Sequence, residues 1–185
     1  MIAIGGIGNP EEQYDETRHN IGFMVLDRLA NNLGLKWENK SSLKAHTAKG
    51  SGYILFKPIT YVNLSGEAVV AIKNFYKFDQ KNLWIVHDDA DLPLGKINIK
   101  FAGSSAGHNG IKSITELLGA NYWRIRLGIG KNEDFNLSDH VLSKFTPTEK
   151  EDVQDVIDQV VDLLVQSLKD HQLQNQTINV TTKNN

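Results

Sequence analysis

Hydrophobic and polar positions along the 185-residue chain follow two periods, one typical of strands and one typical of helices. Residues 1–4 form a short apolar run that stops at glycines, as expected of a buried strand followed by a turn. Farther on, Ile21, Val25, Leu29 and Leu33 recur at four-residue spacing, which predicts a helix with one buried face. The chain is therefore expected to begin with a strand and an amphipathic helix.

Further elements follow in alternation. Short apolar or alternating segments predict strands at GYILFKP, LWIVHDD, KINIKF and WRIRLGIG. Helical spacing predicts helices over residues 67–78 and in GIKSITELLG. Strands that alternate with helices are typical of α/β proteins. The sequence therefore predicts a single α/β domain over residues 1–185, with a twisted mixed sheet, largely parallel, that is flanked by helices.

The last predicted helix has the clearest start signal in the chain. Thr146 suits the N-cap, Pro147 suits the first helical position, and Glu149 is placed for a capping box. From about residue 174 the chain is rich in Gln, Asn, Thr and Lys and offers little to bury. A flexible C-terminal tail is therefore expected over about residues 174–185.

Composition narrows the class of protein. With 40% hydrophobic and 23% charged residues, the chain has the balance of a soluble globular protein. The absence of cysteine excludes disulfides, thiol nucleophiles and cysteine-ligated metal centres. No apolar run approaches the roughly 18 residues of a membrane helix, and the N-terminus lacks the features of a signal peptide. We therefore expect a cytoplasmic protein without a membrane partner.

Charge is unevenly distributed, although the formal net charge is only -2. Residues 96–126 hold five basic residues and one acidic residue, whereas residues 147–170 hold seven acidic and two basic residues. A basic middle segment permits an anionic ligand to bind on one face, and a mixed solvated surface is the plain alternative.

Three motifs admit more than one chemistry. GGIGNP follows the first strand, but Glu11 stands where a dinucleotide-binding fingerprint needs its third glycine. HDDAD, from His87 to Asp91, could bind a metal ion or could supply an aspartate that orients an imidazole, and the second use is favoured because no second ligand cluster is apparent. Ser65 and residues 104–105 lie among small residues, but no G-x-S-x-G elbow surrounds them.

His19 stands in the polar stretch TRHNIGF, directly before the first predicted helix. It could be a solvated residue of a capping region, a metal ligand or a general base. Asn9, Asn63 and Asn109 are expected in loops, where an asparagine can be a turn residue or can hold a carbonyl group or a water molecule. Their occurrence together with the HDDAD aspartates favours a catalytic cleft.

Five segments resemble the bacterial peptidyl-tRNA hydrolase family in order and spacing: GIGNPEEQYDETRHNIGF, KPITYVNLSG, HDDADLPLGKINIKFAG, GHNGIKSI and YWRIRLGIG. Together they span nearly all of residues 1–145. The resemblance implies a monomeric α/β esterase without cofactor, metal or obligate protein partner. Its expected reaction is cleavage of the ester between a peptide and the 3′ ribose of tRNA, which frees the tRNA for reuse in translation.

The resemblance also implies roles for individual residues. His19 would be the catalytic histidine, Asp88 would orient it, and Asn9 would act beside them. The residues implied for binding substrate and tRNA are Asn63 and Asn109 in the cleft, Tyr14 and Tyr61 as aromatic contacts, and Lys100 and Arg126 as basic groups that face the phosphates.

Elementary electrostatics agrees with this assignment. A helix N-terminus disfavours an imidazolium, whereas Asp88 favours it and fixes the tautomer, so the pKa of His19 is expected near neutrality. A water molecule activated by His19 would attack the ester, with an asparagine amide as the oxyanion donor. Two alternatives are a non-catalytic RNA-binding relative and a metal hydrolase built on HDDAD.

The chain departs from the family pattern at a few positions. Glu11 replaces a common glycine, Val62 a usual methionine, and Asn98 a residue that is often basic, while AGSSAG forms the loop before GHNG. None of these changes removes a candidate catalytic group. They are expected to affect tRNA affinity and packing around the peptide.

Overall fold

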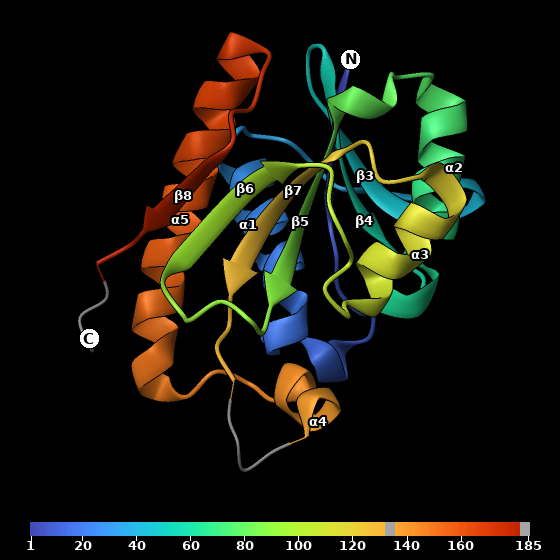
Figure 1. The fold of residues 1–185 in the computed structure, drawn as a ribbon. Helices are drawn as coiled ribbons and strands as arrows, with labels where there is room; N and C mark the ends of the chain where they lie inside the picture. The colour runs from blue at the N-terminus through green and yellow to red at the C-terminus, as the bar shows by residue number, and fades with distance from the viewer. Residues whose placement is uncertain (132–135, 182–185) are drawn as a thin grey trace.

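An eight-stranded sheet with the strand order β2-β3-β4-β1-β5-β7-β6-β8 forms the centre of the computed structural model (Figure 1). The structure describes residues 1–131 and 136–181. The strands are β1 (Ile2–Gly6), β2 (Glu38–Lys40), β3 (Ala45–Lys49), β4 (Tyr53–Pro58), β5 (Leu83–Asp89), β6 (Lys96–Phe101), β7 (Trp123–Gly128) and β8 (Gln176–Asn179). The α-helices are α1 (Ile21–Asn32), α2 (Ser65–Tyr76), α3 (Asn109–Leu118), α4 (Leu137–Leu142) and α5 (Pro147–Asp170).

The four central strands β4, β1, β5 and β7 run parallel to one another. The outer strands β2, β3, β6 and β8 pair in antiparallel fashion. The predicted α/β domain with a mixed sheet is confirmed, and its parallel part is the core of the sheet. Because parallel strands need crossover helices, β1 and β5 are covered on both faces and all their residues are buried.

Helices cover both faces of the sheet, with α1 and α5 on one face and α2 and α3 on the other (Figure 1). Side chains of β5 alternate between the two layers, as expected for a strand. Trp84 and Val86 join the core under α1 and α5, whereas Ile85 joins the core under α2 and α3. The apolar run LWIV is therefore a strand that supplies both cores.

Helix α1 lies unusually close to the sheet because Gly22 has no side chain. A Cβ atom at this position would lie 2.5 Å from the carbonyl oxygen of Val86 and 2.7 Å from the backbone nitrogen of Ile7. Only glycine permits this approach. The start of α1 is thereby brought against the ends of β1 and β5, where the polar motifs of the sequence lie.

The chain terminus differs from expectation. The prediction of a flexible tail over about residues 174–185 is wrong for Gln176–Asn179, which form β8 and pair with β6. The polar composition of this segment did not predict a strand, because the strand is stabilised by pairing with β6, about 80 residues away. The last part of the predicted tail, residues 182–185, lies outside the described residues. The remaining predicted strands and helices are present, and the capping box of Thr146 and Glu149 starts α5 as predicted. No described helix is both long and apolar enough to span a membrane.

Candidate active site

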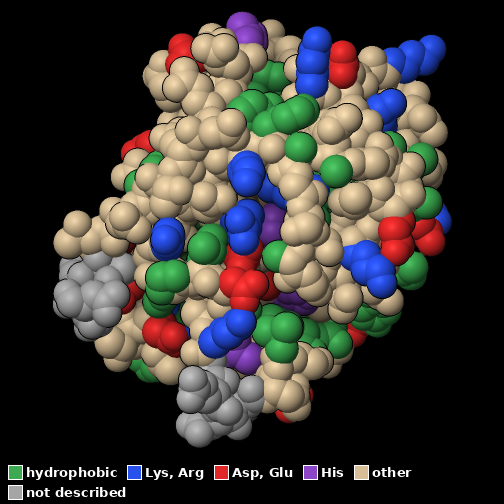
Figure 2. Space-filling model, in the orientation of Figure 1, with side chains coloured by type: hydrophobic (Ala, Val, Ile, Leu, Met, Phe, Trp, Pro, Cys, Tyr) green, Lys and Arg blue, Asp and Glu red, His purple; other side chains and the backbone are tan. Residues whose placement is uncertain are grey.

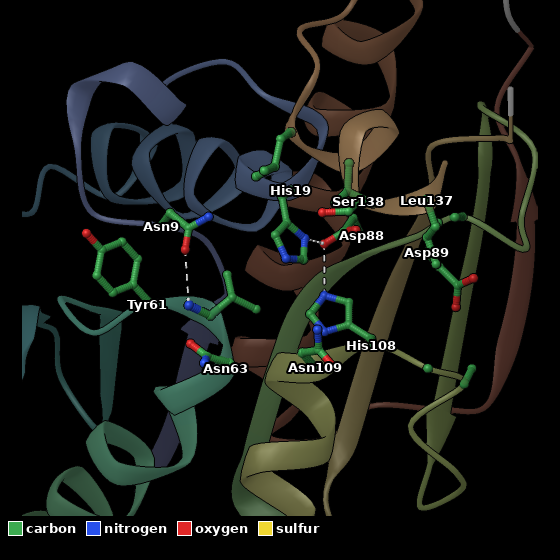
Figure 3. Close-up of a pocket in the computed structure, with 16 residues that line it drawn as sticks. Asn9, His19, Tyr61, Asn63, Asp88, Asp89, His108, Asn109, Leu137 and Ser138 are labelled. Carbon is green, nitrogen blue, oxygen red and sulfur yellow. Dashed lines mark hydrogen bonds and ion pairs between the residues drawn. The ribbon is translucent and has the colours of Figure 1, made fainter. Parts of the chain in front are cut away.

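A cavity of about 570 Å³ opens at the carboxyl ends of β1 and β5 (Figure 3). Open α/β sheets place ligand-binding groups at this end of their strands. The cavity draws residues from six separate segments of the chain, among them Asn9, His19, Tyr61, Val62, Asn63, Asp88, His108, Asn109, Leu137 and Val141. The predicted residues His19, Asp88, Asn9, Asn63, Asn109 and Tyr61 are thus brought together at one cavity.

The central contact of this cavity joins His19 and Asp88. Asp88 lies in β5 and is 1% exposed, and its Oδ1 lies 2.8 Å from Nδ1 of His19. His19 lies in a short 3₁₀ turn, Arg18–Asn20, that leads directly into α1, rather than inside the helix itself. The predicted partnership of a histidine and an aspartate from distant segments is therefore present in the structure.

A second histidine, His108, completes this arrangement (Figure 3). Nε2 of His108 lies 2.9 Å from the same Oδ1 of Asp88. Nδ1 of His108 accepts hydrogen bonds from the backbone N–H groups of Gly110 and Ile111, at 3.1 and 3.3 Å, as the N-cap of α3. These two donors require an unprotonated Nδ1, so neutral His108 carries its proton on Nε2 and donates it to Asp88.

Asn109 in GHNG was predicted to lie in the cleft, whereas its neighbour His108 was not predicted as a site residue. The sequence feature that could have identified His108 is its position immediately before α3. A histidine whose ring caps a helix has a fixed orientation. The cap aims the other ring nitrogen at Asp88.

Electrostatics keeps Asp88 ionised. Burial alone would raise the pKa of Asp88, but His108 and His19 act against it through charge and hydrogen bonding, and the pKa lies well below its usual range. For His19, burial disfavours the imidazolium form, yet the charge and hydrogen bond of Asp88 outweigh burial and raise its pKa. When His19 is neutral with its proton on Nδ1, Nε2 is free to accept a proton.

The turn that carries His19 is anchored by its neighbour Arg18. Its guanidinium donates to both carboxylate oxygens of Glu149, at 3.0 and 2.7 Å, and its Nε donates to Oγ of Ser143 at 3.2 Å. The guanidinium also lies over the ring of Phe145, 4.8 Å from the centroid. This partly buried bidentate pair fixes the turn against the start of α5.

Asn9 lies at the end of β1 and has a defined side-chain orientation. Its Oδ1 accepts a hydrogen bond from the backbone N–H of Val62 at 3.1 Å (Figure 3). Its backbone N–H donates to Oδ1 of Asn20, and its carbonyl accepts from Nδ2 of the same residue. Because Oδ1 is occupied, the amide N–H₂ of Asn9 is the donor that remains for a ligand in the cavity.

The HDDAD motif does not converge on one point. Nδ1 of His87 donates to the carbonyl of Asp88 at 2.7 Å, and burial lowers the pKa of His87 well below its ordinary value. Asp89 accepts from Arg126, and Asp91 pairs with Lys131. Of this motif, Asp88 alone extends its side chain toward His19, so the motif itself forms no metal site.

Among the described residues, His19, Asp88 and His108 form a group of suitable type for a metal ion, with ligand atoms within 4.8 Å of one another. However, Nε2 of His108 carries a proton as long as its Nδ1 caps α3. A metal ion would have to displace this proton and break the cap. The hydrogen-bonded arrangement therefore suits a proton-transfer site better than a metal centre.

The two predicted aromatic contacts, Tyr61 and Tyr14, differ in their position relative to the cavity. Tyr61 is 48% exposed, lines the cavity, and donates its hydroxyl hydrogen bond to Glu11. Tyr14 lies in the adjoining 3₁₀ turn, where its carbonyl accepts from Thr17, and its side chain does not line the cavity.

Lys and Arg side chains gather over β6 and β7, with acidic side chains beside them (Figure 2). Lys100 is exposed on β6 and lies outside the cavity lining. Arg126 on β7 is engaged by two neighbours: its Nε donates to Oδ2 of Asp89 at 2.6 Å, and its Nη1 donates to Oδ1 of Asn98 at 3.3 Å. Both predicted basic residues therefore lie on neighbouring strands outside the cavity lining, and Arg126 is partly neutralised.

Helix α4 forms an apolar wall that the sequence analysis did not predict. Leu137, Val141 and Leu142 line the cavity, and Leu137 is more than half exposed. Large exposed apolar side chains beside a polar cluster are typical of a ligand-binding groove. The short helix escaped notice because its six residues are too few to establish a helical period.

Comparisons with known proteins identify the family of the chain. A family model described as Peptidyl-tRNA hydrolase matches residues 3–185. Peptidyl-tRNA hydrolases of Caldanaerobacter subterraneus subsp. tengcongensis and Campylobacter lari are each 44% identical over 169 residues, covering 89% and 91% of this chain and 91% and 92% of theirs. The crystal structure of peptidyl-tRNA hydrolase from Acinetobacter baumannii superposes with a TM-score of 0.83 at 34% identity, covering 92% of this chain and 91% of that one. These matches over most of the chain establish that the protein belongs to the peptidyl-tRNA hydrolase family.

Proposed function

We propose that His19 is the general base with which this protein hydrolyses the ester between a peptide and the 3′ ribose of tRNA, the reaction of its family. The observation that carries this assignment is the shared acceptor Oδ1 of Asp88, which binds Nδ1 of His19 at 2.8 Å and Nε2 of His108 at 2.9 Å. Asp88 holds His19 in the tautomer that leaves Nε2 unprotonated. Such an oriented imidazole can accept a proton from water.

The reaction then proceeds in two steps. Nε2 of His19 takes a proton from water as the oxygen of that water adds to the ester carbonyl, which gives a tetrahedral oxyanion. The bond to the ribose oxygen then breaks, and the proton on Nε2 passes to that oxygen. The products are a peptide with a free carboxyl group and a tRNA with a free 3′ hydroxyl. Asp88 stays ionised throughout and stabilises the imidazolium that forms transiently.

Asn9 is the proposed oxyanion donor. Its Oδ1 is held by the N–H of Val62, so its amide N–H₂ can face the developing negative charge. Asn63 and Asn109 line the same cavity and are proposed to position the substrate and the attacking water. Tyr61 is proposed to contact the substrate through its ring, because its hydroxyl is bound to Glu11.

The tRNA is proposed to bind over β6 and β7. Lys100 is exposed there, and Arg126 lies on the neighbouring strand, opposite Asn98. Phosphate contacts supply affinity that is independent of base sequence, as an enzyme that accepts many tRNAs requires. Tyr14, which lies outside the cavity lining, is proposed to contact the substrate only beyond the rim.

The proposal includes no metal, no cofactor and no obligate protein partner, and it takes the protein to act as a monomer in the cytoplasm. Light scattering of the purified protein tests the oligomeric state. The metal-free reaction is tested by turnover after exhaustive treatment with EDTA, which would stop a metal hydrolase.

The decisive experiment compares N-acetyl-aminoacyl-tRNA with free aminoacyl-tRNA as substrates in the presence of EDTA. We expect fast hydrolysis of the blocked substrate and little of the free one. His19→Ala should abolish the reaction and leave the far-UV circular dichroism unchanged. The matched control is His171→Asn, which alters a histidine at the far end of α5. Full activity of His19→Ala would refute the assignment, and tRNA binding without hydrolysis by the wild type would favour the RNA-binding alternative.

A further inference from the structure

Arg124 is a buried arginine that takes no direct part in the proposed reaction. It lies on β7 and is 3% exposed, and its guanidinium stands over the ring of Tyr122, 4.8 Å from the centroid. Within residues 1–131 and 136–181, no carboxylate pairs with it. A buried cation without a counterion is costly unless hydrogen bonds satisfy it. The hydrogen-bond partners of Arg124 therefore indicate the structural role of its buried charge.

Both outer nitrogens of this guanidinium bind one loop. Nη2 donates to the carbonyl of Gly103 at 2.6 Å, and Nη1 donates to the carbonyl of Ser104. Nε has no hydrogen-bond partner in the described chain. The planar fork of an arginine suits two successive carbonyls, which a lysine would bind with a single ammonium group.

The loop that Arg124 holds runs from the end of β6 to the start of α3, over residues 102–108. Four of its residues have positive φ: Ala102 (59°), Gly103 (124°), Ala106 (47°) and Gly107 (79°). Alanine is strained in this region because its Cβ atom lies too close to the following carbonyl oxygen. Such a backbone persists only where surrounding contacts over-determine it. Arg124 supplies two of those contacts near the start of the loop.

The far end of the same loop belongs to the catalytic site. Ala106 and Gly107 line the cavity, and His108 follows them directly. His108 donates to Asp88, which in turn binds His19. Arg124 and the catalytic histidine are thus connected through one short, strained segment and a carboxylate.

We propose that Arg124 is a positioning residue for catalysis: it anchors the 102–107 loop so that the loop forms the cavity wall and presents His108 to Asp88. The inference rests on the proposed hydrolytic site, since His108 acts there through Asp88. It also accounts for the buried positive charge, because charged donors bind carbonyl groups more strongly than neutral ones.

The test uses Arg124→Lys, which keeps the charge and loses the fork. We expect kcat/KM for N-acetyl-aminoacyl-tRNA to fall on the order of tenfold, partly through a higher KM because the cavity wall moves. Arg28→Lys is the matched control, because Arg28 is exposed and pairs with Asp158 on the surface. This control should keep the kinetic constants of the wild type.

A positioning role is separated from a general loss of stability by a double-mutant cycle with His108→Asn. This variant keeps an N-cap side chain for α3 but is too short to reach Asp88. If Arg124 acts through His108, Arg124→Lys should cost clearly less in the His108→Asn background than in the wild type. Fully additive losses, or unchanged kinetics of Arg124→Lys, would overturn the proposal.

A spectroscopic readout is independent of turnover. The Nε2–H proton of His108 should give a hydrogen-bonded imidazole signal in the proton NMR spectrum of the wild type, and Arg124→Lys should shift or broaden it. An unchanged signal would contradict the proposal. If the wild type proved inactive on peptidyl-tRNA, the proposed function would fail, whereas this signal would still report whether Arg124 positions His108.

Discussion

Arg18 and Glu149 form a bidentate ion pair that joins the turn bearing His19 to the start of the last helix. The two hydrogen bonds measure 3.0 and 2.7 Å and span 131 residues of sequence. Glu149 simultaneously accepts the backbone N–H of Thr146 in the capping box of α5. One carboxylate therefore stabilises the helix start and holds the turn that bears His19.

Replacing this carboxylate should weaken both structures. In Glu149→Gln the buried guanidinium of Arg18 loses its counterion, and we expect the free energy of unfolding to fall by about 2 kcal/mol. Urea denaturation measures this loss. The control Asp158→Asn removes an exposed ion pair with Arg28 and should change stability by less than about 1 kcal/mol. Equal effects of the two variants would contradict the anchoring role.

Asp88→Asn should change both the rate and its pH dependence. The base form of His19 is the neutral imidazole, so activity rises with pH through the pKa of His19, which Asp88 raises. Removing the negative charge lowers that pKa, and the acid limb of the kcat/KM profile should move to lower pH. The plateau should fall by roughly 10²- to 10⁴-fold because the tautomer is no longer fixed. An acid limb that stays in place would show that another group controls it.

His108→Asn isolates the hydrogen bond between His108 and Asp88. The asparagine can still accept the N–H groups at the start of α3, so the free energy of unfolding should change by less than about 1 kcal/mol. We expect kcat to fall on the order of tenfold because Asp88 loses one of its two donors. His108→Ala, by contrast, should lose stability as well. Identical stability of the two variants would contradict the capping role.

Asn9→Asp keeps the hydrogen-bond acceptor of the Asn9 side chain and removes its donor. The aspartate can still accept the N–H of Val62, but it offers no N–H₂ to the oxyanion. We expect kcat to fall about 10²- to 10³-fold with a smaller change in KM. Single-turnover kinetics with bound substrate measures the chemical step directly. A loss confined to KM would assign Asn9 to substrate binding alone.

Lys100→Gln should weaken tRNA binding in a salt-dependent manner. Each lost phosphate contact lowers the slope of log K against log salt concentration by about 1. Titration of tRNA at several salt concentrations measures this slope, and Lys49→Gln, at the far end of the sheet, is the control. Arg126→Gln should have the smaller effect on the slope, because Asp89 already neutralises part of its charge. A slope that Lys100→Gln leaves unchanged would place the tRNA elsewhere.

Sequence patterns located most of the fold and the centre of the site because those signals are local. The run LWIV identifies a buried strand, and the aspartates that follow it necessarily lie at the edge where α/β proteins bind ligands. The resemblance to the hydrolase family then connected Asp88 with His19. What it did not specify was which nitrogen of His19 meets the carboxylate, and in the structure this is Nδ1, 2.8 Å from Oδ1 of Asp88.

The overlooked features depend on distant partners. His108 was not predicted as a site residue, and its contact with Asp88 arises only from the tertiary placement of α3, whose N-cap it forms. Strand β8 is polar and short, so its existence depends on pairing with β6. Arg124 was counted as part of a basic segment, whereas folding turns it inward toward the loop that it anchors.

The place of β1 has a consequence for how the active protein can be assembled. This first strand lies between β4 and β5, and its pairing with Leu83–Val86 joins segments about 80 residues apart. Contacts of such long range slow folding, because the loop between them must close before they form. A chain cut between α2 and β5 would leave His19 on one piece and Asp88 on the other. Neither piece could be active alone, and activity would reappear only when the two pieces bind each other through β1.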